Sequence, residues 1–281
     1  MTTVTSGKNA PSELDSTPVE KKKQPRISRS KRDRRSFPPL RGLLILIIFL
    51  AAWEIFGDAR SPYYPVPFSW GAALAALWNE GVLLPAMVST LVTFVISLVV
   101  ATILGGLLGA LIGASRLAHR SLSPTLEFLR AIPAATIVPI AVLLIGYEER
   151  MKVTVVVFTA IWPILLNTMS AVRNLSPILL DTAASLHLSA FDRRRKILFP
   201  SLLPAMLLGV RVAAPIALVI VLLVEILTHV SGVGALIATA QQTFESPAVF
   251  GLIIVTGIFG LLVNGIVVAL EAYFFRYRPH H

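Results

Sequence analysis

Five polar side chains stand within or at the edges of strongly apolar stretches of this sequence. They are Asn167, Thr168, Ser170, Arg211 and Glu225. A charge at the centre of a bilayer costs roughly 3 kcal/mol or more unless it is paired or wet, so such residues are candidates for a functional site. Arg211 could bind an anionic group, snorkel to the membrane surface or form a structural ion pair. Glu225 could equally be a charge at the membrane edge.

The sequence lacks the residue patterns of the common catalytic and metal sites. It has no cysteine, which excludes disulfides and zinc–thiolate sites, and its histidines show no metal-ligand spacing. The glycine pair in SGVGAL, residues 231–236, lacks the strand and the lysine of a phosphate loop, so it predicts a turn into a short outer helix. We therefore expect no catalytic residue, no metal and no nucleotide site in this chain.

Composition indicates a membrane protein. The chain is 55% hydrophobic and 14% charged, whereas about a quarter of the residues of a soluble domain are charged. The net charge of +10 is concentrated at the start, because 11 of the 25 Lys and Arg residues lie in the first 41 positions. We expect residues 1–41 to be a disordered cytoplasmic tail that touches anionic lipid, not a nucleic-acid-binding arm.

Residues 42–281 are expected to form an all-α, polytopic membrane domain. A helix needs about 20 apolar residues to cross the hydrocarbon. The expected spans are six: 42–57, 86–114, 132–147, 152–171, 202–228 and 249–274. We interpret the first as a retained span and not as a signal peptide, because no small-x-small cleavage site follows it. With both termini cytoplasmic, ten of the basic residues beyond the tail face inside and three face outside, as the positive-inside rule requires.

The second expected span carries a stripe of small residues four positions apart, Ala101, Gly105, Gly109 and Gly113. Small residues let helix backbones approach closely, which stabilises helix pairs in lipid. The stripe indicates either ordinary bundle packing or a tightly packed helix beside a pathway.

Residues 174–199, between the fourth and fifth spans, are long enough for two short helices at the cytoplasmic surface. An acid and small residues in "DTAASL" are followed by the basic cluster "RRRK". Such a helical excursion could dock into a groove of another protein, because small and apolar residues allow close approach and an acid directs a hydrogen bond. The alternative is a plain interfacial loop.

The segment resembles the cytoplasmic EAA loop of ABC-importer permeases, whose pattern runs E-x-A-x-x-x-G and closes on a hydrophobic-x-L-P. Asp181, Ala183 and His187 stand at the acid, the small residue and the glycine, and Ile197, Phe199 and Pro200 stand at the close. "LRAIPAATIVPIAVLLIGYEERMKV", "LFPSLLPAMLLGVRVAA" and "VEILTHVSGVGAL" resemble the nitrate, sulfonate and taurine branch of that family. The resemblance covers about residues 62 to 275.

Two positions depart from the family pattern. Asp181 is one methylene shorter than the usual glutamate, and His187 replaces the glycine. Histidine tolerates a left-handed turn better than branched residues do, so the turn can survive with some strain. The departures bear on the strength of the docking contact more than on its existence.

The resemblance implies a permease subunit of a bacterial ABC importer in the inner membrane, with no enzymatic activity of its own. The implied partners are a second permease copy, identical or homologous, two cytoplasmic ATPase subunits that hold ATP and Mg, and an extracytoplasmic solute-binding protein. The implied ATPase-coupling residues are Leu180, Asp181, Thr182, Ala183, Ala184, Ser185, Leu186, His187, Leu188 and Ser189.

The same resemblance gives the expected solute, a small anion or organic acid such as a sulfonate, nitrate or bicarbonate. The polar residues at depth, Asn167, Thr168, Ser170, Arg211 and Glu225, then become pathway candidates. A neutral or cationic vitamin precursor is the alternative cargo. Two other classes fit the sequence less well: an ATP-independent channel would leave the docking segment without a use, and an intramembrane enzyme would need paired catalytic groups that the sequence lacks.

Overall fold

The computed structural model describes residues 40–58, 61, 63–176, 178, 185–186 and 189–275. Residues 1–39 of the expected tail lie outside that part of the chain. So do seven of the expected coupling residues, Leu180, Asp181, Thr182, Ala183, Ala184, His187 and Leu188. The chain divides into two units, Met1–Ile45 and Leu46–His281, and every contact described below lies within the second.

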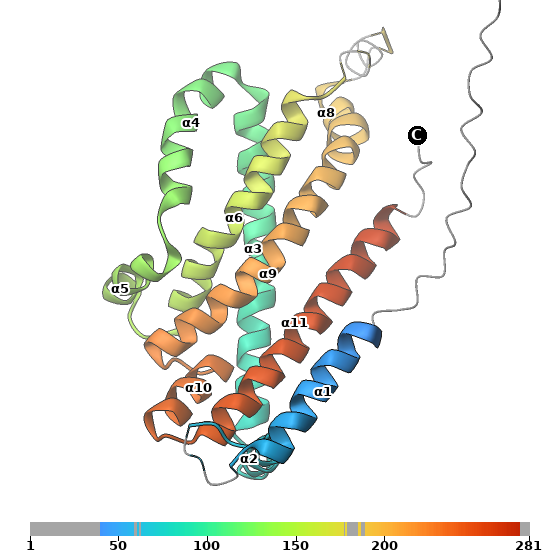
Figure 1. Ribbon diagram of the computed structural model, residues 1–281. Coiled ribbons are helices and arrows are strands. Elements are labelled where there is room, and N and C mark those ends of the chain that lie inside the picture. The colour runs from blue at the N-terminus through green and yellow to red at the C-terminus, as the bar shows by residue number, and fades with distance from the viewer. Residues whose placement is uncertain are drawn as a thin grey trace, which may run out of the picture. The chain divides into compact units, whose positions relative to one another are not determined.

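Every regular element in the described residues is a helix (Figure 1). The order along the chain is α1 (Leu40–Phe56), α2 (Pro67–Asn79), α3 (Leu83–Ala114), α4 (Arg116–Ala131), α5 (Ala134–Ile145), α6 (Glu149–Arg173), α8 (Ala190–Arg193), the π-helical turn η1 (Arg194–Leu198), α9 (Phe199–Thr228), α10 (Val233–Gln242) and α11 (Ser246–Phe275). The all-α prediction is thereby confirmed for this part of the chain.

Four helices of the described residues are long and apolar enough to cross a membrane. They cover Leu83–Ala114, Glu149–Arg173, Arg195–Thr228 and Ser246–Ala269, and they coincide with the second, fourth, fifth and sixth expected spans. A bent pair, α4 with α5, raises the number to five if it is one span, and the apolar part of α1, Leu44–Phe56, is a shorter helix.

The region of the third expected span differs from the expectation. Residues 132–147 contain α5, a helix of 12 residues, whose length of about 18 Å is well short of the roughly 30 Å of hydrocarbon. The preceding residues, read as a simple connection, form the amphipathic helix α4, and the two helices meet at 91°. The bend falls at Pro133, because proline has no N–H to continue the hydrogen-bond ladder of α4.

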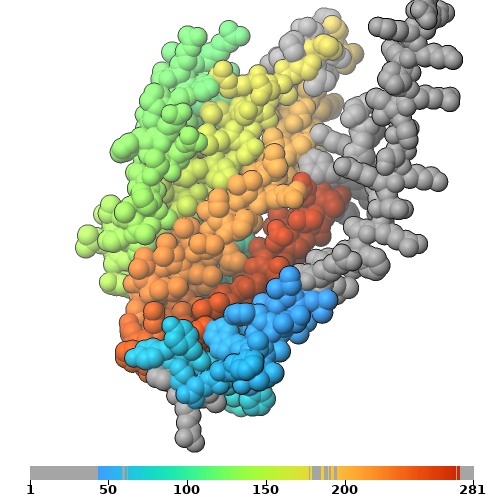
Figure 2. Space-filling view, in the orientation of Figure 1, coloured from blue at the N-terminus to red at the C-terminus, as the bar shows by residue number. Residues whose placement is uncertain are grey.

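The core of the second unit is made by α3, α6 and α9. Helices α6 and α9 run side by side (Figure 1), and α3 packs along α6 over most of its length. Aliphatic side chains from α6 and α9, such as Val155, Ile164 and Val221, are fully buried between them. In contrast, α4 buries none of its residues and stands with α5 at the edge of the face seen in Figure 2.

The small-residue stripe of α3 faces α6. A Cβ added at Gly109 would lie 2.5 Å from the carbonyl oxygen of Leu165, and one at Gly113 would lie 2.8 Å from that of Met169. Ala101, Gly105 and Gly109 are buried, and Gly113 is partly buried. The two backbones are therefore so close that a larger residue would force the helices apart.

Trp70 lies in packing that the sequence did not predict. Its aromatic neighbours Tyr63, Tyr64 and Trp78 are exposed. Trp70 is buried, stacks on Phe250 of α11 with a centroid distance of 5.2 Å, and donates a hydrogen bond from Nε1 to a backbone oxygen of the preceding turn. It therefore joins α2 to α11.

Candidate functional site

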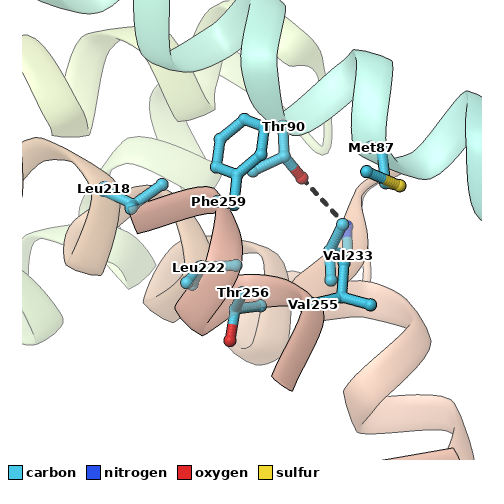
Figure 3. Close-up of a pocket in the computed structure, with 8 residues that line it drawn as sticks. All are labelled: Met87, Thr90, Leu218, Leu222, Val233, Val255, Thr256 and Phe259. Carbon is cyan, nitrogen blue, oxygen red and sulfur yellow. Dashed lines mark hydrogen bonds between the residues drawn. The ribbon is translucent and has the colours of Figure 1, made fainter. Parts of the chain in front are cut away.

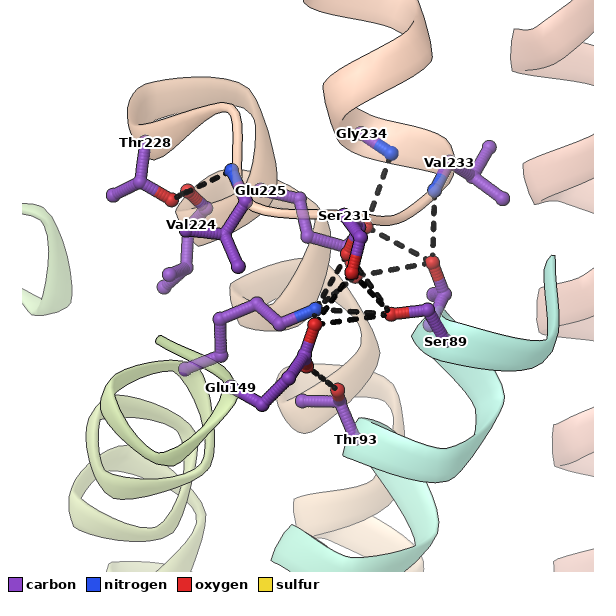
Figure 4. Close-up of polar contacts among 12 residues, drawn as sticks. Ser89, Thr93, Glu149, Val224, Glu225, Thr228, Ser231, Val233 and Gly234 are labelled. Atoms are coloured by element: carbon purple, nitrogen blue, oxygen red, sulfur yellow. Dashed lines mark hydrogen bonds and ion pairs between the residues drawn. The ribbon is translucent and has the colours of Figure 1, made fainter. Parts of the chain in front are cut away.

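A cluster of polar side chains closes the α10 end of the α3–α6–α9 core (Figure 4). We call it the Lys152 cluster. It contains Ser89, Thr90 and Thr93 of α3, Glu149 and Lys152 of α6, Glu225 of α9 and Ser231 of the turn before α10. Polar side chains therefore hold three core helices and one turn together. The distribution of apolar residues along the sequence does not predict these contacts.

Lys152 is the centre of this cluster, and its side chain is fully buried. Its Nζ lies 2.7 Å from Glu149 Oε2 and 3.5 Å from Glu225 Oε1. It also donates to Ser89 Oγ at 3.2 Å and to the backbone oxygen of Ser231. A buried ammonium requires such partners, because it cannot recover its lost hydration in any other way.

Glu225 is also fully buried, and it accepts hydrogen bonds from three sides. Thr90 Oγ1 lies 2.9 Å from its Oε2, and the backbone N–H of Gly234 donates to the same oxygen at 3.0 Å. Thr90 in turn accepts from the N–H of Val233 at 2.9 Å. The carboxylate therefore receives one N–H group of the first turn of α10 directly, from Gly234, and is linked to a second, that of Val233, through the Thr90 hydroxyl.

The glycine pair of SGVGAL is explained by this carboxylate. Gly232 has φ of +150°, and a Cβ there would collide with the carboxyl atoms of Glu225. A Cβ at Gly234 would lie 2.7 Å from Glu225 Cβ. The predicted turn into a short helix is confirmed, since α10 begins at Val233. The glycines are needed because the turn passes directly over the buried acid.

The Lys152 cluster reaches the surface through Glu149, whose side chain is 53% exposed. Glu149, Ser89, Thr93 and Ser231 lie along a groove of about 440 Å³ whose other walls are aliphatic. A second cavity, beside Thr90 between α3, α9, α10 and α11, measures about 10 Å³ (Figure 3). It has room for about one water, so it is too small for a solute.

Arg211 does not lie in the Lys152 cluster. Its Nη1 lies 3.0 Å from Glu271 Oε2 of α11, and its side chain is 50% exposed. Of the alternatives raised for this residue, the ion pair is present in the structure. The pair links α9 to α11 and leaves half of the Arg211 side chain accessible.

The α6 candidates lie in the half of the helix away from the Lys152 cluster. Asn167 Nδ2 donates to the backbone oxygen of Pro163 at 2.7 Å, and Thr168 Oγ1 donates to that of Ile164 at 2.8 Å. Thr168 is buried, whereas Ser170 is exposed. Thr168 therefore has an internal partner, while Asn167 and Ser170 keep part of their surface open.

Three of the ten expected coupling residues belong to the described part of the chain. Ser185 and Leu186 are exposed. The hydroxyl of Ser189 accepts from the N–H of Asp192 at 3.1 Å, and Ser189 also donates to the Asp192 carboxylate at 2.9 Å. This is a capping arrangement that fixes the start of α8. Hydrogen bonds from Lys196 and Ser189 lower the pKa of the Asp192 carboxyl, which therefore stays ionised at neutral pH.

No group of three His, Cys, Asp or Glu side chains that could hold a metal ion occurs in the described residues. Sequence reasoning missed two residues of the Lys152 cluster: Lys152 was counted only as one of three basic residues outside the membrane, and Glu149 was not considered. One available signal was that they stand one helical turn apart at the start of an apolar span. The pairing of Lys152 with Glu225, 73 positions away, could not be inferred from spacing.

The fold and these features define a polytopic helical membrane subunit, and comparison identifies its family. The family model described as "Binding-protein-dependent transport system inner membrane component" matches residues 101–276. The chain belongs to this family. It is therefore a multi-pass protein of the inner membrane, and the expected membership of the ABC-importer permeases is confirmed.

Three relatives come from the expected branch. SsuC of Bacillus subtilis, named an aliphatic sulfonates transport permease, is 26% identical, over 89% of this chain and 92% of its own. The bicarbonate transport system permease CmpB of Synechococcus elongatus is 28% identical, over 85% and 89%. The nitrate import permease NrtB of Leptolyngbya laminosa is 31% identical, over 54% and 55%.

The fold also resembles a solved transporter. A chain of the inward-facing MetNI methionine ABC transporter superposes with a TM-score of 0.60 and 14% identity, and the match covers 70% of this chain and 97% of that one. At this identity the likeness establishes the helical arrangement only.

Proposed function

We propose that this permease carries a small anion, of the sulfonate, nitrate or bicarbonate class, inward across the membrane. The observation that supports this most is the family match over residues 101–276, together with relatives named for those three solutes. The chain itself contributes the membrane passage, and ATP hydrolysis belongs to a separate subunit of the transporter.

We further propose six spans with both termini in the cytoplasm, α1 and the bent α4–α5 pair being the first and third. In this orientation the end of the bundle that carries α8 is cytoplasmic. The basic residues support the assignment, because Arg116, Arg120 and Arg173 stand at that end. Residues 1–41 then form a basic cytoplasmic tail beside anionic lipid.

Coupling to the ATPases is proposed to occur through residues 180–189. The exposure of Ser185 and Leu186 and the capped start of α8 support a docking role. Because α8 and η1 lead without a break into α9, a displacement of the docked segment would be transmitted along α9 toward the Lys152 cluster. Two such chains, or this chain and a homologue, would enclose the pathway.

The pathway is proposed to pass the exposed polar groups of the bundle. The accessible half of Arg211 offers a guanidinium to an anion, and the nearby Glu271 carboxylate keeps that attraction moderate. Asn167 and Ser170 offer further hydrogen bonds from α6. Glu225 lines the pathway only if the Lys152 cluster opens, because its carboxylate is enclosed by the chain in this conformation.

Co-purification in mild detergent tests the whole proposal. The chain should be recovered from its native membrane with an ATPase and a binding protein at a fixed ratio. Calorimetry of that binding protein with taurine, nitrate and bicarbonate, and with a neutral pyrimidine as the matched non-anionic ligand, then tests the solute class. Binding of the pyrimidine alone would replace the anion by a vitamin precursor, and recovery of the chain without any ATPase would favour a channel.

A further inference from the structure

The end of the bundle opposite the Lys152 cluster contains a third pocket, which is basic and measures about 550 Å³. It is bounded by the α3–α4 turn, the first turns of α4, the end of α6 and the end of η1. Its cationic residues are Arg116, Arg120 and Arg173, and His119 lies beside them. No acidic residue is among the described residues that line it.

The three arginines of this pocket differ from the other basic residues that were described above. Lys152, Lys196 and Arg211 each form an ion pair with a carboxylate. No ion pair joins the guanidinium groups of the pocket arginines to a carboxylate of the described part of the chain. Three like charges around one concavity repel one another, so the pocket gains most from a bound anion.

The remaining walls indicate what kind of anion fits. Val172, Leu175 and Leu198 line the pocket together with its arginines. The pocket lies where the long apolar helices α3 and α6 end, and thus at the level where hydrocarbon gives way to headgroups. Arginine binds phosphate through two parallel N–H···O bonds, and basic pockets between membrane helices accept anionic headgroups.

We propose that this pocket binds a phosphate anion, held by Arg116, Arg120 and Arg173, and that its source is the headgroup of an anionic phospholipid whose chains lie against the aliphatic walls. The site does not belong to the proposed solute pathway. Leu175 and Leu198 line the pocket, and in the chain they stand before and after the proposed coupling segment, residues 180–189. A bound lipid would therefore contact the chain on both sides of that segment.

Lipid retention tests the proposal. The full chain, purified in mild detergent, is exposed to equal amounts of phosphatidylglycerol and phosphatidylcholine, and retained lipid is counted by native mass spectrometry. We expect about a tenfold preference of the wild type for phosphatidylglycerol, and the loss of that preference in the variant R116Q/R120Q/R173Q.

A matched variant removes the same charge outside the pocket. Arg130, Arg150 and Arg195 are exposed and do not line it, so R130Q/R150Q/R195Q should retain phosphatidylglycerol like the wild type. Equal losses in both triple variants would mean diffuse attraction between charged surfaces and would overturn the site. No preference in the wild type would overturn it as well.

The source of the phosphate is tested separately. Inorganic phosphate is added to the lipid-loaded chain at an ionic strength matched with chloride. Retention of the lipid supports the headgroup as ligand. If inorganic phosphate displaces the lipid, and this displacement depends on the same arginines, the lipid source is overturned and free phosphate is the ligand. Both triple variants should elute and melt like the wild type, because the exchanged side chains are exposed. Since the readout is binding and not uptake, it is independent of the proposed transport function.

Discussion

At the scale of single residues, Lys152 is the centre of a buried polar cluster. Its ammonium is fully buried and joins Glu149, Glu225, Ser89 and the Ser231 backbone. Its removal would leave the buried Glu225 carboxylate without a counter-charge. An uncompensated buried charge is far more costly than the net contribution of the pair.

We therefore predict that Lys152→Met lowers the stability of the bundle by about 3–5 kcal/mol. The measurement is thermal unfolding of the purified chain in detergent, followed by fluorescence-detected size exclusion. Arg150→Met is the matched control, because Arg150 is exposed two positions away. If both variants melt like the wild type, Lys152 is not needed to hold the cluster.

The same cluster allows a second test of the charge argument. The double variant Lys152→Met with Glu225→Gln removes both buried charges while keeping the amide within reach of Thr90 and Gly234. The double variant should recover part of the stability that Lys152→Met loses, because the uncompensated carboxylate of Glu225 is gone. A double variant less stable than either single one would show that the individual hydrogen bonds matter more than the charge.

At the scale of elements, the α3–α6 contact depends on residues without side chains. We predict that Gly109→Ala destabilises the chain by about 1–3 kcal/mol, because the new Cβ would lie 2.5 Å from a backbone oxygen. The control is Gly265→Ala in α11, where an added Cβ meets nothing within 4 Å. That variant should be neutral or slightly more stable. Equal melting temperatures for the two variants would contradict the close approach.

The coupling segment carries a prediction about transport. Replacing Asp181 or Ala183 by Trp should uncouple ATP hydrolysis from uptake while leaving insertion intact, because a bulky side chain blocks docking in a groove. Uptake and ATPase activity are measured together in proteoliposomes that contain all subunits. Phe128→Trp is the control, as Phe128 of α4 is exposed and lies outside the segment. Normal uptake by the Asp181 and Ala183 variants would refute the docking role.

Sequence reasoning correctly predicted the helices that can be recognised by the length of an apolar run. The spans around residues 86–114, 152–171, 202–228 and 249–274 were predicted because each is a long apolar run, and no tertiary contact is needed to recognise one. Helix α4 was missed because its apolar positions alternate with charged ones and include Pro124. Its pattern is that of an amphipathic helix, and a search for continuous apolar runs does not detect it.

At the scale of the site, side-chain partners decided what could be predicted. Polar residues at depth were recognised individually, as with Glu225 and Arg211, because each is conspicuous in an apolar run. Their partners Lys152 and Glu271 lie 73 and 60 positions away. Such pairing depends on how the helices cross. The spacing of residues along the chain does not reveal that geometry.

At the scale of the whole molecule, the absence of cysteine makes the proposed orientation directly testable. Leu117 and Phe244 are both exposed and lie near opposite ends of the bundle. With an impermeant maleimide on intact cells, Phe244→Cys should be labelled and Leu117→Cys should react only after permeabilisation. The reverse pattern would invert the proposed orientation and place the α8 end outside.

The bend between α4 and α5 has a consequence for the solvent around this chain. Helix α4 runs back along the bundle for 16 residues, about 24 Å, before it stops at a proline. The carbonyls of Arg130 and Ala131 then accept no hydrogen bond from another described residue. Unmet backbone carbonyls do not persist against lipid tails. With α4 and α5 proposed as one span, we expect water or a neighbouring chain to reach that depth, so that the hydrocarbon beside this subunit is not a uniform insulator.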